Sequence, residues 1–403
     1  MLLYHHQSLG QSTFWVFILD SIGFFSVSDP NFSENHEEGR LRLQFYVFYI
    51  IYHSHLYIFS SKKNGLANMQ DLNFPKLIHG SSSLGNLFKV VEYKTKVEIV
   101  QKMIESSPDG RIVIDTAGKY GAGLALEAIG QALKELKVAP ENVIISNKLG
   151  WIRVPLTTPE PTFEKGAWMG IDNDAVQNIS YEGILTCYEQ GNELLGDYNT
   201  SLASVHDPDE YLDAATDPED RARRMEDIKG AYRALFELKA QGKVKGVGVG
   251  SKQWRIIKEL YDGGIKFDWV MFANSYTIYN KPAEVVEFIN SLASDGVFVI
   301  NSAVFQAGFL TGGSFFDYVA VTRESRPELF EWRDTFFRIC QEHKQDPALV
   351  AVQYVLKLPA ISSIALSSSR PSRVVSNGTL ITGVVPDEVW AALAEAGIID
   401  PIA

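Results

Sequence analysis

The chain has few of the features that define several large classes of protein. Its 403 residues include only two cysteines, Cys187 and Cys340, which lack the spacing of a metal-binding motif. This argues against a disulfide-stabilised scaffold and against a zinc–thiolate site, and it fits a reducing compartment. We therefore predict a cytoplasmic protein without a metal centre.

Basic residues are in the minority. The chain has 37 Lys and Arg against 49 Asp and Glu, which gives a formal net charge of −12. A nucleic-acid-binding protein needs a basic surface, so nucleic acid is not expected as a partner. An anionic cofactor remains compatible with this balance, because a few local donors are enough to hold a phosphate group.

Long hydrophobic runs are also missing. A helix that crosses a bilayer takes about 20 apolar residues, whereas the aromatic-rich runs at 14–19 and 45–52 are shorter and polar residues interrupt 41–59. A membrane partner is therefore not favoured. We interpret residues 1–68 as an atypical extension, or as the product of a start site placed too early, because Met69 stands just before the patterned sequence. The domain proper is expected to cover residues 69–403.

From residue 77 onward, short apolar segments alternate with helical patterns. Continuous apolar runs of this length are typical of strands buried on both faces of a parallel sheet. Eight strands alternating with helices predict a (β/α)₈ TIM barrel, and a doubly wound sheet is the alternative. The predicted strands are Leu77–Ser82, Arg111–Ile114, Val143–Ser146, Leu202–Val205, Val244–Val249, Phe267–Phe272, Val297–Asn301 and Ser363–Leu366.

Glycine placement favours the barrel over the doubly wound sheet. That sheet would require a glycine-rich fingerprint after an early strand. Gly246, Gly248 and Gly250 lie within a predicted strand instead, where we expect them to permit a close approach of neighbouring groups. Ser251, which follows them, is predicted to cap a helix over Lys252–Tyr261.

Two segments interrupt the alternation of strands and helices. Trp151–Ser180 is rich in Pro, Gly and Trp, and Asp207–Asp227 is dense in Asp, Glu and Arg. Both follow strand ends, so in a barrel both are expected as long loops on the face where the strands end and active sites form. With Gly308–Asp317, they are expected to determine the substrate.

Four side chains that can carry protons lie at the ends of three consecutive predicted strands. Asp115 and Tyr120 follow the second strand, Lys148 follows the third and His206 follows the fourth. A barrel brings these ends to one rim. There Tyr120 could exchange a proton with a substrate oxygen, Lys148 could favour the tyrosinate, Asp115 could position Lys148, and His206 could orient the substrate.

These residues also carry a resemblance. Asp115-Thr-Ala-x-x-Tyr120-Gly, Lys148 after its strand and Val205-His206-Asp-Pro resemble the aldo-keto reductases, over about residues 77–377. The resemblance implies that Asp115, Tyr120, Lys148 and His206 form a catalytic tetrad. It also implies a nicotinamide dinucleotide, NAD or NADP, bound without a Rossmann fold. The reaction expected is hydride transfer between this cofactor and a small carbonyl compound or sugar.

Further motifs are similar to one branch of that family. Ser83-Leu-Gly-Asn86-Leu, Gly121-Ala-Gly-Leu and Val205-His-Asp-Pro-Asp209 resemble the D-threo-aldose 1-dehydrogenases, which oxidise C1 of a cyclic sugar to a lactone. A general aldehyde or ketone reductase, or a pyridoxal dehydrogenase, is the alternative within the family. A non-catalytic subunit that binds the cofactor is the alternative from another class, because a fold alone does not determine function.

The resemblance also assigns cofactor contacts. Asn274 lies near the position at which the family has a glutamine that binds the nicotinamide carboxamide. Asn301-Ser302-Ala303 occupies the position at which many members have a tyrosine that stacks on the nicotinamide ring. Arg373 corresponds to an arginine that meets the 2′-phosphate, and Asn377 to an adenine contact. Ser367 and Ser368 occupy the place of a lysine–serine pair, which weakens the case for NADP over NAD. The predicted cofactor-binding residues are Asn274, Ser302, Ser367, Ser368, Arg373 and Asn377.

Overall fold

The computed structural model describes residues 2–8, 11–17, 74–107 and 111–400, and the chain divides into two units, Met1–Leu66 and Ala67–Ala403. In the first unit, strand β1 (Leu2–Ser8) pairs antiparallel with β2 (Gln11–Phe17). The predicted boundary between residues 68 and 69 lies outside the described residues. Within the described ranges, no helix is long and apolar enough to cross a membrane.

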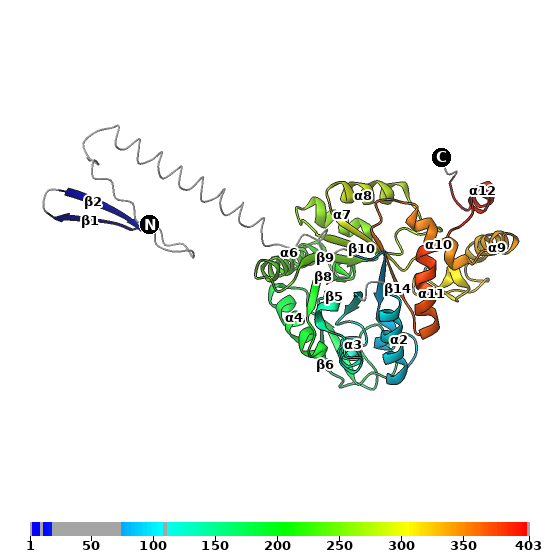
Figure 1. Ribbon diagram of the computed structural model, residues 1–403, viewed down its shortest axis with the longest axis horizontal. Helices are drawn as coiled ribbons and strands as arrows, with labels where there is room; N and C mark the ends of the chain where they lie inside the picture. The colour runs from blue at the N-terminus through cyan, green and yellow to red at the C-terminus, as the bar shows by residue number, and fades with distance from the viewer. Residues whose placement is uncertain (1, 9–10, 18–73, 108–110, 401–403) are drawn as a thin grey trace. The chain divides into compact units, whose positions relative to one another are not determined.

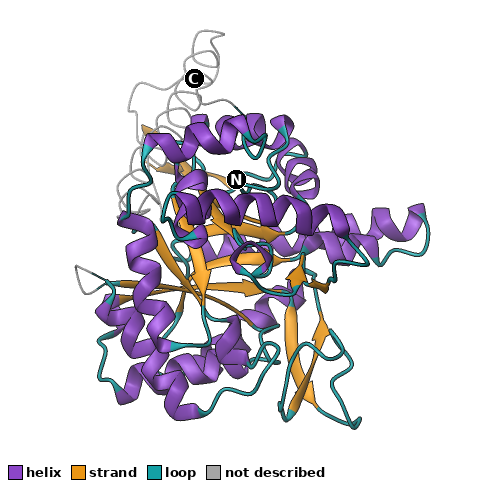
Figure 2. Ribbon diagram, turned by 90° about the vertical axis from the view of Figure 1, so that its right-hand side faces the viewer, coloured by secondary structure: helices purple, strands orange, loops and turns teal. Residues whose placement is uncertain are grey.

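The second unit contains a closed barrel of eight parallel strands (Figures 1 and 2). The barrel closes where β14 pairs with β3, with Ile364 opposite Leu77. All eight predicted strands are present, with ends that differ by at most three residues from prediction, so the predicted fold class is confirmed. The strands are β3 (Leu77–Gly80), β4 (Ile112–Ala117), β5 (Val143–Leu149), β8 (Thr200–His206), β9 (Gly246–Ser251), β10 (Trp269–Ala273), β11 (Phe298–Ser302) and β14 (Ser363–Ser367).

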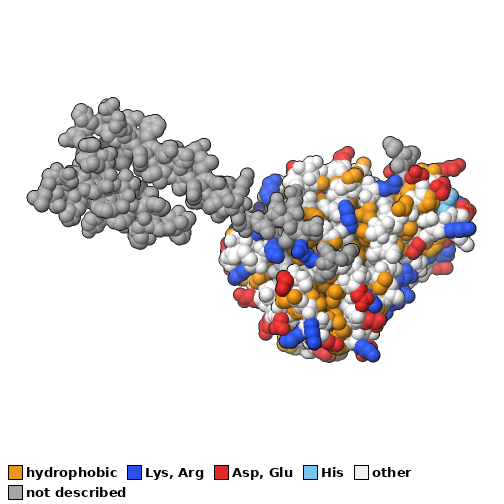
Figure 3. Space-filling model, in the orientation of Figure 1, with side chains coloured by type: hydrophobic (Ala, Val, Ile, Leu, Met, Phe, Trp, Pro, Cys, Tyr) orange, Lys and Arg blue, Asp and Glu red, His pale blue; other side chains and the backbone are white. Residues whose placement is uncertain are grey.

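Helices cover the outside of the barrel (Figure 2). Those that follow successive strands are α2 (Tyr93–Glu105), α3 (Leu124–Glu135), α4 (Tyr181–Leu195), α6 (Pro218–Ala240), α7 (Trp254–Asp262), α8 (Ala283–Ser294), α10 (Pro347–Leu356) and α11 (Pro371–Thr382). Additional elements are the hairpins β6 (Trp151–Pro155)–β7 (Asn173–Gln177) and β12 (Phe315–Phe316)–β13 (Val319–Ala320), and helices α5 (Pro208–Asp213), α9 (Pro327–Glu342) and α12 (Asp387–Glu395). On the face shown in Figure 3, acidic and basic side chains are interspersed.

Apolar side chains fill both faces of the strands, as the continuous hydrophobic runs predicted. One side chain from each barrel strand but β9, and two from β10, form a cluster that includes Ile78, Val113, Leu202 and Trp269. Larger clusters pack the other face of the strands against the helices. Each strand is therefore buried on both faces, as parallel barrels require.

Gly248 and Gly250 give β9 the close approaches that the sequence predicted. A Cβ atom at Gly248 would lie 2.2 Å from Cδ2 of Trp269, which stands opposite it in β10. A Cβ at Gly250 would lie 2.9 Å from Cδ of Lys148. The first glycine therefore makes room for the core indole, and the second makes room for the lysine stem.

Two local predictions were wrong. Ser251 does not cap a helix, because it is the last residue of β9, opposite Phe272 of β10, and α7 begins only at Trp254. Its hydroxyl instead accepts a hydrogen bond of 3.1 Å from the backbone N–H of Gln253. Strand pairing with a neighbour outweighs the local preference of serine for a cap.

Asp207–Asp227 is mostly helical, although we expected a long loop. Helix α5 occupies its first part, and α6 begins at Pro218, where the Asp217 side chain accepts a hydrogen bond from the N–H of Asp220. The dense charges form ion pairs along α6, Asp220 with Arg224 and Arg223 with Asp227, one turn apart. Such pairs stabilise a helix, so high polarity alone did not indicate a loop here.

The replacement Gly248→Ala should destabilise the barrel by about 2–4 kcal/mol, because the new methyl group overlaps the Trp269 ring and the backbone cannot withdraw. Urea unfolding followed by circular dichroism measures this. Gly378→Ala is the matched control, since a Cβ there meets nothing within 4 Å and the residue lies inside α11. That change should be neutral or stabilise by up to about 1 kcal/mol. Equal stability of the two variants would contradict the packing role.

Candidate active site

The four predicted catalytic residues come together at one end of the barrel. Parallel pairing of β4, β5 and β8 aligns the strand ends, with Lys148 opposite Ala117 on one side and Ser204 on the other. Asp115 and Lys148 lie near the ends of β4 and β5, and His206 is the last residue of β8. Tyr120 lies in the connection between β4 and α3.

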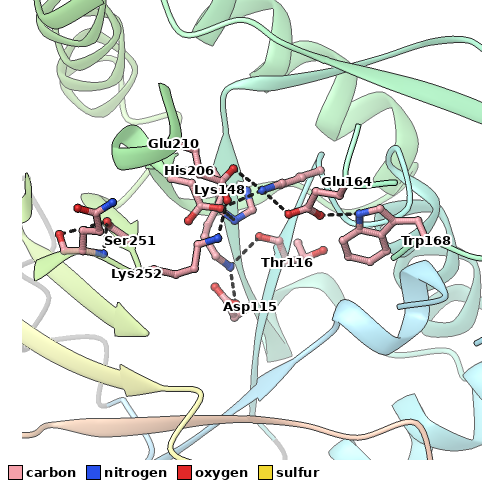
Figure 4. Close-up of polar contacts among 12 residues, drawn as sticks. Asp115, Thr116, Lys148, Glu164, Trp168, His206, Glu210, Ser251 and Lys252 are labelled. Atoms are coloured by element: carbon pink, nitrogen blue, oxygen red, sulfur yellow. Dashed lines mark hydrogen bonds and ion pairs between the residues drawn. The ribbon is translucent and has the colours of Figure 1, made fainter. Parts of the chain in front are cut away.

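Asp115 and Lys148 form a buried ion pair (Figure 4). The Nζ atom of Lys148 lies 2.5 Å from Oδ2 of Asp115, and both side chains are 5% exposed. The same ammonium also donates to the backbone carbonyl of Thr116 at 3.4 Å. Burial raises the pKa of Asp115, and the attraction and hydrogen bond from Lys148 oppose that rise. Each charge therefore depends on the other, because an unpaired charge at this depth is costly.

The phenol of Tyr120 is surrounded by this pair and two ring systems. Nζ of Lys148 lies 4.9 Å from the Tyr120 ring centroid. The His206 ring packs edge-on, with centroids 5.6 Å apart and an angle of 83° between the planes. The Trp168 ring packs against Tyr120 with a centroid separation of 5.7 Å.

The pKa of Tyr120 shifts in the direction opposite to the one expected from the sequence. There we expected Lys148 to favour the tyrosinate and so to lower this pKa. Burial first, then Asp115, Tyr318 and Asp207, raise this pKa well above its ordinary value, and the charge of Lys119 opposes the rise. Asp115 offsets the charge of Lys148, so the pair acts on the phenol nearly as a dipole. In the protein alone Tyr120 therefore holds its proton firmly.

His206 is a neutral imidazole. Burial, and next the charges of Lys148 and Lys119, hold its pKa well below the ordinary value. Its Nε2 atom lies 3.4 Å from a carboxylate oxygen of Asp207, and its buried Nδ1 atom has no hydrogen-bond partner among the described residues. A neutral ring presents one donor and one acceptor, so one nitrogen of His206 can donate a hydrogen bond and the other can accept one.

The predicted loop Trp151–Ser180 contains a hairpin that forms one wall of this site. Strands β6 and β7 pair antiparallel, with Trp151 opposite Gln177. The connection between them packs Phe163 and Trp168 in an apolar cluster that Tyr120 joins. The segment therefore lies where the sequence analysis placed it, although its strands were not foreseen.

A cluster of charges next to Tyr120 was missed by the sequence analysis. The ammonium of Lys119 pairs with Asp207 at 3.1 Å, with Glu210 at 2.7 Å and with Glu164 at 2.8 Å. Lys252 also pairs with Glu210, at 2.5 Å. The signal that the sequence offered was a lysine directly before the motif tyrosine. The three carboxylates that it meets are distant along the chain.

Asp209, which the sequence analysis named only as part of a motif, has an environment that was not foreseen. Its side chain belongs to the first turn of α5 and is almost fully buried, and Oδ1 has no hydrogen-bond partner among the described residues. Burial and the charge of Asp207 raise its pKa to about 6, while a hydrogen bond from Ser251 opposes the rise. This carboxyl is therefore partly protonated in mildly acidic solution.

At the expected nicotinamide end, the structure places Asn274 and Ser302 side by side. Asn274 directly follows β10, and Ser302 is the last residue of β11. The backbone N–H of Asn274 donates a hydrogen bond of 3.3 Å to the backbone carbonyl of Ser302. The Asn274 side chain donates to Asp317 at 2.6 Å, and its buried Oδ1 has no partner among the described residues. The Ser302 hydroxyl donates to the carbonyl of Phe272. The side-chain oxygen of Asn274 is thus a buried acceptor that the described residues leave unpaired.

The expected adenosine end lies around the start of α11. Ser367 ends β14, with its hydroxyl 3.2 Å from that of Ser82, and the carbonyl of Ser368 accepts from Ser83 at 2.7 Å. Arg373 is exposed in the first turn of α11, whose N-terminus has no side-chain cap, and Asn377 is buried one turn further. An uncapped helix N-terminus beside an arginine suits a phosphate group. The residues present therefore fit a nicotinamide dinucleotide.

The model of the aldo/keto reductase family matches residues 76–398. The chain belongs to the aldo/keto reductase family. The predicted family is therefore confirmed, and with it an oxidoreductase that acts on CH–OH groups with a nicotinamide cofactor.

Two characterised aldo/keto reductase relatives cover most of the chain. Pyridoxal 4-dehydrogenase of Microbacterium luteolum is 27% identical over 79% of this chain and 93% of its own length. D-threo-aldose 1-dehydrogenase of a Pseudomonas species is 26% identical over 81% of this chain and 95% of its own. The predicted similarity to these two groups is confirmed.

Solved structures support the fold. Glycerol dehydrogenase of Gluconobacter oxydans superimposes with a TM-score of 0.57 at 18% identity, covering 81% of this chain and 94% of its own. The holo form of an aldo-keto reductase of Bacillus halodurans gives a TM-score of 0.58 at 21% identity, covering 81% and 93%. At these identities the likeness extends to the barrel and no further.

The raised pKa of Asp209 predicts a pH-dependent loss of stability. A folded pKa of about 6 against an ordinary value of 3.8 means that the fold binds this proton more tightly than the unfolded chain. The resulting stabilisation is complete below about pH 4 and is lost as the pH rises through about 6, by roughly 3 kcal/mol. Asp209→Asn should therefore gain stability relative to the unsubstituted protein between pH 4.5 and about 7.5.

Urea-unfolding free energies of both proteins across this range measure the effect of Asp209. Asp172→Asn, at an exposed position in the same half of the chain, controls for the loss of one surface charge. A constant difference between Asp209→Asn and the unsubstituted protein at every pH would show that Asp209 ionises as easily in the fold as outside it.

Proposed function

We propose that this protein oxidises the C1 hydroxyl of a cyclic aldose to a lactone with NAD or NADP, and that Tyr120 exchanges the proton. The observation that carries this is the grouping of Tyr120, His206 and the Asp115–Lys148 pair at the barrel mouth. The similarity to D-threo-aldose 1-dehydrogenase supports the substrate class.

Each of the four residues has a distinct task in this reaction. The neutral imidazole of His206 orients the substrate oxygen through a hydrogen bond. The Tyr120 hydroxyl exchanges a proton with that oxygen, and Lys148, held in place by Asp115, keeps its ammonium 4.9 Å from the centroid of the ring on which negative charge develops. A bound nicotinamide dinucleotide supplies the hydride acceptor for oxidation, or the donor for reduction. We assign the contact with its carboxamide to the Asn274 side chain, with Ser302 beside it.

The charges around Tyr120 favour an uncharged substrate. The ammonium groups of Lys119, Lys148 and Lys252 each form an ion pair with a carboxylate. Paired ammonium groups attract an anionic substrate weakly, whereas carboxylates and aromatic rings such as Trp168 suit a sugar with its hydroxyls and apolar faces. Pyridoxal, a ring-shaped compound without net charge near neutral pH, is the alternative substrate that the similarity to pyridoxal 4-dehydrogenase supports.

We further propose that the reaction takes place in the cytoplasm. Cys187 and Cys340 are both buried, free thiols, as is usual in a reducing compartment.

Replacing Tyr120 by Phe should lower turnover at least about 100-fold, because proton exchange by a positioned side chain contributes about 10²–10⁴-fold. Nicotinamide absorbance with L-fucose, L-galactose, D-arabinose and pyridoxal, each tested with NAD and NADP, measures the rate. Tyr93→Phe, an exposed tyrosine at the start of α2, is the matched control and should keep full activity. Equal turnover by Tyr120→Phe and the unsubstituted enzyme would refute the role of Tyr120.

The raised pKa of Tyr120 also predicts the pH dependence of the reaction. Oxidation requires the deprotonated phenol, whose fraction grows as the pH approaches a pKa above the ordinary value of 10.0. The kcat/KM of sugar oxidation should therefore rise from pH 7 to at least about 10. The reverse reaction, which needs the protonated phenol, should be faster at neutral pH than at about pH 10. A plateau of oxidation that begins near pH 7 would contradict the raised pKa.

Arg373→Ala should separate the two cofactors. If this guanidinium binds the 2′-phosphate, its loss should raise the KM for NADP about tenfold or more and change the KM for NAD much less. Arg338→Ala, an exposed arginine on α9, serves as the control. Equal changes in the two KM values would remove Arg373 from the phosphate site.

A further inference from the structure

Lys119 is an unusual lysine because its charge is buried beside the catalytic phenol. Its side chain is 3% exposed, and its ammonium contacts Glu164, Asp207 and Glu210. It also lies 5.0 Å from the centroid of the Trp151 ring. Burying an ammonium is costly unless partners compensate it, so these carboxylates hold the group in one place.

One of the three carboxylates connects Lys119 to the wall of the site. Oε1 of Glu164 lies 2.8 Å from the Lys119 ammonium, and Oε2 accepts a hydrogen bond of 2.7 Å from the indole N–H of Trp168. Figure 4 shows the Glu164 carboxylate turned toward this indole. The Trp168 ring in turn packs against Tyr120. A continuous chain of contacts thus runs from Lys119 through Glu164 and Trp168 to the phenol.

The backbone gives independent support for a constraint at this cluster. Glu164 has φ of +40° and Asp207 has φ of +47°, values that residues other than glycine adopt rarely. Such conformations persist where the surroundings hold them in place. Both residues are partners of Lys119, so its ion pairs are among the contacts that hold these backbone conformations.

The backbone around Trp168 is held by other contacts. The N–H of Phe88 donates to the carbonyl of Ala167 at 2.7 Å, and the N–H of Met169 donates to the carbonyl of Asn86 at 3.1 Å. An isolated bridge also pairs Leu87 with Trp168. Loss of the Lys119 ion pairs should therefore free the indole ring while the segment itself stays attached to the barrel.

We propose that Lys119 is a positioning residue, which acts through Glu164 to hold the Trp168 indole against Tyr120 and so shapes the wall that the substrate contacts. The kinetic part of this proposal rests on the proposed function, since it concerns the substrate of Tyr120. The orientation of the indole does not depend on which substrate the enzyme takes.

The orientation of Trp168 can be tested without a substrate. In full-length protein labelled with ¹⁵N at the tryptophan indoles, Trp168→Phe identifies the Trp168 signal. In Lys119→Met this signal should shift, and its N–H should exchange with solvent about tenfold faster or more, because the carboxylate that it binds has lost its anchor. Lys119→Arg, which keeps the charge, should restore most of the protection. Lys165→Met removes an exposed lysine from the same loop and should change nothing.

Kinetics with the best substrate of the sugar and pyridoxal panel test the effect on the site. Lys119→Met should raise KM about tenfold because a disordered wall weakens binding, and kcat should fall as well because the Lys119 charge that opposes the raised pKa of Tyr120 is lost. Lys119→Arg should recover most of the lost affinity. A purely structural lysine would lower the amount of folded enzyme and leave KM unchanged.

The two measurements test the positioning role of Lys119 and the proposed function separately. An unchanged Trp168 signal in folded Lys119→Met overturns the positioning role, whatever the enzyme oxidises. A changed signal with no turnover by the unsubstituted protein on any panel member leaves the positioning of Trp168 established and overturns the proposed function. If Lys119→Met does not fold, Lys119→Gln, whose uncharged amide holds the carboxylates more weakly than an ammonium, gives the same test with a smaller change in the same direction.

Discussion

The ion pair between Asp115 and Lys148 is the interaction on which the rest of the site depends. Removing one partner would leave the other charge buried, which costs about 3–5 kcal/mol. The pair exists because β4 and β5 are adjacent and parallel, and because Gly250 on β9 leaves space for the lysine stem. Tyr120 and His206 are arranged around it. The architecture of the barrel thus determines where a proton can be exchanged.

Most of the fold could be predicted from the sequence. Continuous apolar runs identified all eight barrel strands, since both faces of each strand are buried and no polar alternation is needed. Ser251 was assigned to a helix because its own preference was considered without the partner strand, which extends β9 through it. Asp207–Asp227 was predicted to be a loop because it is dense in charged residues. The prediction did not consider that these charges pair one helical turn apart, as Arg224 does with Asp220.

The predicted site residues are close together, yet their energetics required coordinates. The order of the strands placed Asp115, Lys148 and His206 on one rim, so the sequence could predict their grouping. It could not show that Asp115 offsets the charge of Lys148 and that burial raises the pKa of Tyr120. The ion pairs of Lys119 could not be predicted from the sequence either, because its partners lie between 45 and 91 residues further along the chain.

The account's central claim is that the grouped residues remove a proton from a sugar hydroxyl as hydride leaves C1. The most direct measurement follows deuterium from C1-labelled L-fucose into the reduced nicotinamide by mass spectrometry, with Lys148→Met and the unsubstituted enzyme side by side. The account predicts one deuterium transferred per turnover, with labelled cofactor formed far more slowly by the variant than by the unsubstituted enzyme. Absence of label from the cofactor during turnover, or equal rates of label transfer by both proteins, would contradict it.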